Sequence, residues 1–188
     1  MSLRRRRIDS AGLDAYVEAL RRELPGFSIR YKDESPLQRG IAALVRPFNP
    51  RYLDGYTTVM FGNVYFPSRR WCEAVGPSAL YRTLRHEAVH LRDMRRWPLV
   101  FQLSYLFGGP AVFTARAIWE ARAYAESLRV SMELDGDITD RELDRIVRAF
   151  TGSDYLFMCP FPRFVRRRLR RLRDELRREL ASHDKVVP

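Results

Sequence analysis

The segment that most constrains the fold is His86-Glu87-Ala88-Val89-His90, near the middle of a chain of 188 residues. In a helix, residues four apart lie one turn apart on the same face, so both histidines would point the same way. Ser78 is a suitable N-cap residue ahead of this segment. We therefore predict a helix from Ser78 to about Met94 that presents two imidazoles side by side.

Two imidazoles on one helical face can bind a single metal ion, with metal–nitrogen distances of about 2.0–2.1 Å for zinc. Glu87 points to the flank of this face, where its carboxylate can accept a proton without binding the metal. Zinc lowers the pKa of its water toward about 7, and a neighbouring carboxylate completes what a zinc hydrolase needs. We predict one zinc ion (Zn2+) per chain, bound by His86 and His90, with Glu87 as the general base. The alternative is a helix that carries two surface histidines and no metal.

Three acidic residues are candidates for the remaining protein ligand. Asp93 shares the histidine face, but its short side chain starts nearly two turns from His86, so we expect it to support His90 by a hydrogen bond. Glu120 follows His90 by 30 residues, belongs to another predicted helix and can approach the metal from the open side. Glu126 is the fallback, since it points elsewhere on that second helix. We predict Glu120 as the third ligand.

From about Tyr56 to about Leu128 the sequence resembles the zincin metallopeptidases and, more narrowly, the gluzincins. The resemblance lies in the HExxH motif and in the stretch that starts at Glu120 and ends at Tyr124, which is similar to the third-ligand helix of small bacterial gluzincins. It implies an α+β, zincin-like fold that is mostly helical, with a small β-hairpin or sheet ahead of the HExxH helix. It also implies a peptidase that acts on a peptide or protein substrate.

Three positions after the motif differ from related patterns. Arg92 stands where the extended zincin pattern prefers an apolar residue. Asp93 and Arg96 occupy the positions at which metzincins need a glycine and a further ligand, so that subgroup is excluded. Zincins also tend to have a strand before the motif helix whose edge pairs with substrate. The hairpin from Thr57 to Phe66 is the candidate for that role, and an ordinary core hairpin is equally compatible with the sequence.

Two tyrosines are candidates for stabilising the charge that develops on a substrate oxygen. Tyr124 lies one turn after Glu120 and faces the same way. Tyr155 belongs to a segment that could fold back over a cleft. We select Tyr124 as the catalytic candidate, although buried tyrosines more often serve as plain core residues.

The hydrophobic pattern predicts the other elements. Helices are expected at 13–24, 37–45, 120–132 and 141–150, the last capped by Thr139, and a strand at 27–31. The segment Tyr56–Phe66 is expected to form a hairpin with a type II′ turn at Gly62-Asn63. Apolar residues from Phe161 to Leu180 recur every three or four positions, which predicts a long amphipathic helix. We place a zincin-like catalytic domain at 1–160 and a basic C-terminal helix and tail at 161–188.

The net charge of +11 is concentrated at the two ends of the chain. Arg4–Arg7 form one basic segment, and nine arginines between Arg163 and Arg178 form the other. Both are candidates for contact with an anionic surface, either a membrane or nucleic acid. A basic face that is simply solvated is the alternative for the second segment.

The 19 residues from Trp97 to Ala115 carry no charge. A single membrane crossing here would separate His90 from Glu120, so we expect a helical hairpin that turns at Gly108–Pro110. This hairpin is either buried core or a segment that dips into a membrane surface.

Cys72 and Cys159 do not form the pattern of a disulfide framework, and no apolar stretch follows the N-terminal arginines as it would in a signal peptide. A cytoplasmic location, with or without membrane association, is therefore expected. A non-catalytic binding protein that uses the hairpin and the basic helix remains the alternative from another functional class.

Overall fold

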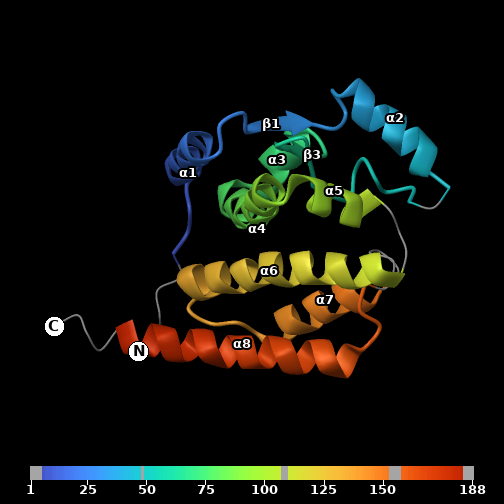
Figure 1. Ribbon diagram of the computed structural model, residues 1–188. Coiled ribbons are helices and arrows are strands. Elements are labelled where there is room, and N and C mark those ends of the chain that lie inside the picture. Colours follow the sequence, from blue (N-terminus) through green and yellow to red (C-terminus); the bar gives the residue numbers. More distant parts are fainter. Residues whose placement is uncertain (1–5, 48, 107–109, 153–157, 184–188) are drawn as a thin grey trace. The chain divides into compact units, whose positions relative to one another are not determined.

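The computed structural model describes residues 6–47, 49–106, 110–152 and 158–183 (Figure 1). The chain divides into two compact units, one formed by Ile8–Leu99 and the other by Val100–Pro188 together with Met1–Arg7. The described residues are mostly helical, with one small sheet, so the α+β class is confirmed. The predicted boundary between residues 160 and 161 stays a prediction.

The unit Ile8–Leu99 contains a three-stranded sheet in the order β1-β3-β2. Strand β3 (Asn63–Phe66) pairs in parallel with β1 (Ser28–Tyr31) and antiparallel with β2 (Thr58–Met60). All four residues of β3 are buried, as expected for a central strand covered on both faces. The helices of this unit are α1 (Ser10–Glu23), α2 (Pro36–Val45), α3 (Arg69–Val75) and α4 (Pro77–Arg96). The sequence did not predict α3.

The predicted hairpin is confirmed, but its turn is one residue earlier than expected. Met60 pairs with Asn63, so the two turn residues are Phe61 and Gly62. Both have positive φ, 50° at Phe61 and 77° at Gly62, which is the geometry of a type I′ turn and not of type II′. The type I′ twist matches that of the flanking strands, and Asn63 therefore belongs to β3.

The helix α4 begins slightly earlier than predicted and has a different cap. Its N-cap is Gly76, Pro77 occupies the first turn, and no side chain caps the helix. Ser78 was wrong as the cap: its hydroxyl accepts a hydrogen bond from the Ile8 amide and donates one to the Ile8 carbonyl, each at 2.9 Å. Proline at the start of a helix removes an amide that would otherwise need a cap.

The packing of α4 fixes which of its faces is turned toward the sheet. Leu84, Ala88 and Leu91 of α4 belong to a buried cluster that also contains residues of α1 and β3, namely Val17, Leu20, Val64 and Phe66. At the end of α4 the guanidinium of Arg92 donates to both carboxylate oxygens of Glu23, at 2.6 and 2.8 Å. This hydrogen bond lowers the pKa of Glu23 below its usual value. Arg92 thus joins α4 to α1, which accounts for a charged residue at this position.

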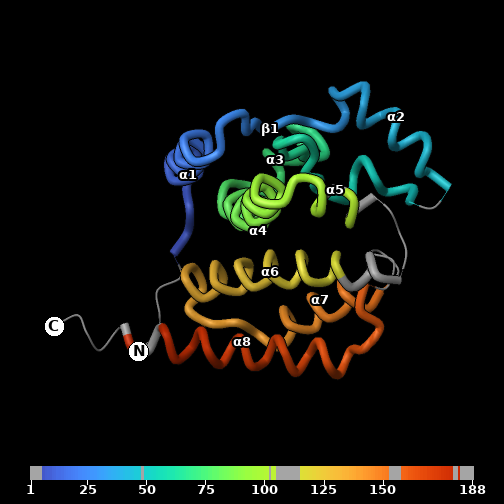
Figure 2. The backbone as a smooth tube through the Cα atoms, in the orientation of Figure 1, coloured from blue at the N-terminus to red at the C-terminus, as the bar shows by residue number. Residues whose placement is uncertain are grey.

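The second unit is helical in its described residues. It comprises α5 (Pro98–Leu106), α6 (Pro110–Asp135), α7 (Asp140–Thr151) and α8 (Pro162–His183). Thr139 caps α7 as predicted, since its hydroxyl accepts a hydrogen bond from the Glu142 amide. The chain reverses direction between α6 and α7 and again between α7 and α8 (Figure 2). The three helices share one buried cluster that includes Leu128, Ile146 and Leu169.

The uncharged stretch from Trp97 to Ala115 is confirmed as two helical segments, α5 and the start of α6. They contact each other: the Trp119 indole donates to the Ser104 hydroxyl at 3.0 Å, and the Phe101 and Trp119 rings are 5.6 Å apart. The predicted turn at Gly108–Pro110 falls largely on residues 107–109, which lie outside the described residues. Phe101 is buried, whereas Leu99, Val100 and Leu103 are exposed. Among the described helices, none is both long enough and apolar enough to span a bilayer.

Candidate metal centre

The two motif histidines lie side by side in the middle of an uninterrupted helix of 20 residues. Their ring centroids are 5.1 Å apart and the ring planes are inclined by 77°. Because Leu84, Ala88 and Leu91 are held in the core, α4 cannot rotate without losing buried contacts. The sequence therefore places both imidazoles in a fixed position relative to each other.

The polar residues of this face are unusually well buried. Only 4% of His90, 8% of Glu87 and 1% of Asp93 is exposed, while His86 is half-buried. Buried carboxylates and imidazoles are costly unless they are hydrogen-bonded, paired or bound to a metal. Three such residues within two turns of one helix therefore indicate a built polar site and not a solvated helix surface.

Glu120 lies on α6 and is also buried, with 5% of its surface exposed. His86, His90 and Glu120 could together hold a metal ion, since each offers one ligand atom and these atoms all lie within 4.8 Å of one another. It is the one such group found among the residues that the structure describes.

The chemistry of this donor set fits zinc. Two imidazole nitrogens and one carboxylate oxygen form a known ligand set of catalytic zinc sites, which leave a fourth position open for water or substrate. Softer metals favour thiolates, and Mg2+ or Ca2+ favour oxygen alone. Neither cysteine belongs to the group, and burial raises the pKa of the Cys72 thiol to about 11.

The other predicted site residues have the following positions. Asp93 is buried on α4, and Glu126 accepts a hydrogen bond from Arg129 at 3.0 Å; neither belongs to the metal-binding group. Tyr124 is half-buried, and its ring centroid lies 5.5 Å from that of Phe150. Its role toward substrate stays a prediction. Tyr155 lies outside the described residues.

Lys32 is a charged residue near this site that the sequence analysis did not single out. It follows β1 and is completely buried, and its ammonium donates to the Tyr52 carbonyl at 2.7 Å and lies 4.1 Å from the Tyr52 ring centroid. Burial lowers its pKa from 10.5 to about 8, while the negative charges of Glu87 and Asp54 act in the opposite direction. Lys32 and Glu87 therefore interact electrostatically within the unit Ile8–Leu99.

The only sequence signal for Lys32 is that lysine is rare in this chain, which has 34 Lys and Arg residues, of which just two are lysines, Lys32 and Lys185.

Comparisons of the chain with protein-family models, with curated proteins and with solved structures found no match. Function is therefore inferred from the residues of this chain and their geometry.

Proposed function

We propose that the chain is a zinc-dependent metallohydrolase that cleaves peptide bonds on a zincin-like scaffold. The observation that supports this most strongly is the grouping of His86, His90 and Glu120, with buried Glu87 beside it on α4. A general base next to an open metal position is the minimal arrangement for metal-assisted hydrolysis. One zinc ion per chain is expected.

His86, His90 and Glu120 would hold the metal, and a bound zinc ion would supply an acidified water and a Lewis acid for the substrate carbonyl. Glu87 is adjacent to a ligand and does not belong to the ligand group, and in this proposal its carboxylate accepts the proton of the attacking water. Asp93 lies three residues after the second histidine on α4, and in this proposal it orients that ring by a hydrogen bond.

Two features support a peptide as substrate. The first is the resemblance to gluzincins described above. The second is the sheet order β1-β3-β2, in which the outer edge of β2 has no strand partner among the described residues. An extended peptide can add to such an edge through main-chain hydrogen bonds.

In this proposal Tyr124 donates a hydrogen bond to the substrate oxygen as negative charge develops on it.

Hydrolysis of an unfolded protein substrate by the zinc-loaded chain tests this proposal, with Glu87→Gln as the decisive variant. The glutamine keeps the size of the side chain but cannot accept a proton, so activity should fall by roughly 10²–10⁴-fold while zinc stays bound. Asp54→Asn, which changes an exposed carboxylate in the same unit, is the matched control and should keep its activity. A Glu87→Gln variant as active as the parent would remove this residue from the mechanism. Zinc binding without hydrolysis of any peptide tested would favour a non-catalytic binding protein.

A further inference from the structure

The helix α8 has one apolar side that is fully used in packing. Val165, Leu169 and Leu176 are buried in the cluster shared with α6 and α7. These residues recur at helical spacing and define the inward side of α8. The remaining surface of the helix is dominated by arginine.

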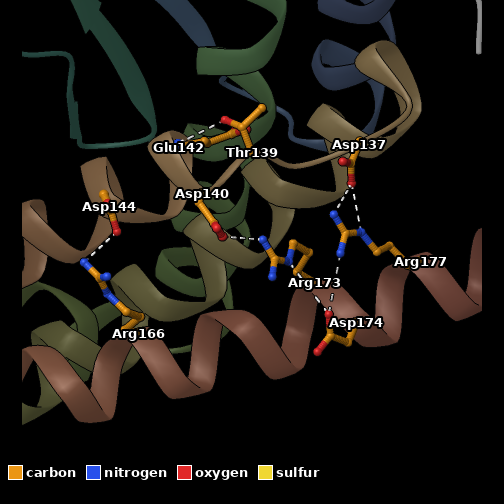
Figure 3. A network of polar contacts seen from close by, with 9 residues as sticks. All are labelled: Asp137, Thr139, Asp140, Glu142, Asp144, Arg166, Arg173, Asp174 and Arg177. Atoms are coloured by element: carbon orange, nitrogen blue, oxygen red, sulfur yellow. Dashed lines mark hydrogen bonds and ion pairs between the residues drawn. The ribbon is translucent and has the colours of Figure 1, made fainter.

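Three arginines at the margin of the buried side form ion pairs with α7 or with the segment before it (Figure 3). Arg166 pairs with Asp144 at 2.6 Å and Arg173 pairs with Asp140 at 2.6 Å. Arg177 pairs with Asp137 at 2.7 Å. Together with the apolar contacts, these pairs fix the rotation of α8 and therefore determine which arginines point outward.

The outward side carries a second set of arginines. Arg163, Arg167, Arg168 and Arg171 are exposed, and no ion pair among the described residues includes them. Arg167 and Arg168 lie three and four residues after Phe164, and Arg171 lies seven after it, so all share one helical face. Phe161 and Phe164 are 65% and 60% exposed at the start of this face. We call these six residues the arginine face.

We propose that the arginine face binds the surface of a membrane that contains anionic lipids. Guanidinium groups form bidentate hydrogen bonds with phosphate, and several in a row attract a negatively charged leaflet. Two exposed phenylalanines beside them can enter the boundary between headgroups and acyl chains. The inference does not depend on the proposed enzymatic activity.

The distribution of the aromatic residues favours lipid over nucleic acid. Proteins that bind single strands alternate aromatic platforms with basic residues along a groove, so that successive bases can stack. Here Phe161 and Phe164 lie at one end of the face with Arg163 between them, and Arg167, Arg168 and Arg171 follow without a further aromatic residue. An apolar end next to a basic stripe fits the flat surface of a membrane. There the inserted phenylalanines and the charged arginines would each contribute to the binding free energy.

Partition of the full chain between buffer and vesicles tests this proposal. Vesicles of phosphatidylcholine with phosphatidylglycerol should bind the protein, and vesicles of phosphatidylcholine alone should bind it far less. One basic residue near such a surface changes the partition constant by roughly fivefold. The double variant Arg167→Gln/Arg171→Gln should therefore bind the anionic vesicles about 25-fold more weakly.

A control and a second variant make the test specific. Arg166→Gln/Arg177→Gln removes the same charge from the paired positions and should change binding by less than about threefold, because these groups face α7. Phe161→Ser/Phe164→Ser should weaken vesicle binding by about tenfold or more while leaving the charge unchanged. The proposal would be overturned if both arginine double variants lost vesicle binding equally, or if the parent bound both kinds of vesicle equally. It would also be overturned if the protein bound duplex DNA more tightly than vesicles and the phenylalanine variant bound like the parent.

Discussion

Replacing Lys32 by methionine should make the stability of the protein depend differently on pH. The folded chain lowers the pKa of Lys32 from 10.5 to about 8 because the ammonium is buried. A group with a lowered folded pKa contributes stability above its unfolded pKa, here 10.5, and loses it as the pH falls through the folded pKa, here about 8. The buried charge of Lys32 therefore lowers the free energy of unfolding of the parent at neutral pH, and this loss disappears at alkaline pH, where the lysine is neutral.

The size of the effect follows from the two pKa values. One pKa unit corresponds to about 1.36 kcal/mol, so the penalty is about 3 kcal/mol at pH 7 and about 1 kcal/mol at pH 10. Lys32→Met removes the penalty but leaves the Tyr52 carbonyl without its donor, which costs about 1–3 kcal/mol at every pH. At pH 7 these terms nearly offset each other, so the absolute stability of the variant is a poor test.

The informative quantity is the change with pH of the difference between variant and parent. Urea unfolding at pH 7 and pH 10 should show the parent gaining about 2–3 kcal/mol relative to Lys32→Met. Arg30→Met, at an exposed position on β1 just before Lys32, is the control and should show no such change, because arginine does not titrate in this range. A difference that is constant between the two pH values would refute the assignment of a lowered pKa to Lys32.

Four further results are expected. In zinc titrations, Glu120→Ala should lose the metal severely, whereas Asp93→Ala should bind it only about 10–100-fold more weakly; the reverse order would overturn the ligand assignment. Arg92→Ala should lower the free energy of unfolding by about 0.5–1 kcal/mol at pH 7, and the loss should shrink as the pH falls through the lowered pKa of Glu23, because its carboxylate is then protonated in both proteins. Gly62→Ala should cost about 1 kcal/mol because of its φ of 77°, although nothing lies within 4 Å of the added carbon. Gly40→Ala, in the middle of α2 and equally open, should instead stabilise the fold by about 0.5–1 kcal/mol in the same urea assay.

Local patterns in the sequence predicted most of the elements. The helical spacing of apolar residues located α1, α4, α7 and α8, because each buries one side in a core. Alternation on both sides of a glycine located the hairpin. The turn was displaced by one residue because Phe61 adopts a positive φ, which an aromatic residue rarely does. The short helix α3 has no apolar period long enough to be recognised.

The candidate site was only partly accessible from the sequence. The pair His86 and His90 follows from helical geometry alone, since both residues belong to one element. The grouping with Glu120 depends on how the chain returns over 30 residues, which no local pattern determines. Lys32 could not be found, because its burial and its charge interaction with Glu87 arise from tertiary packing.

Zinc content tests the central claim most directly. The parent protein and the double variant His86→Ala/His90→Ala are loaded with zinc, dialysed against zinc-free buffer and subjected to elemental analysis, with circular dichroism as a check that both are folded. We predict close to one zinc ion per parent chain and essentially none in the variant, because two of the three expected ligands are lost. Full zinc occupancy in the folded double variant, or a parent that retains no zinc, would contradict the proposed metal centre.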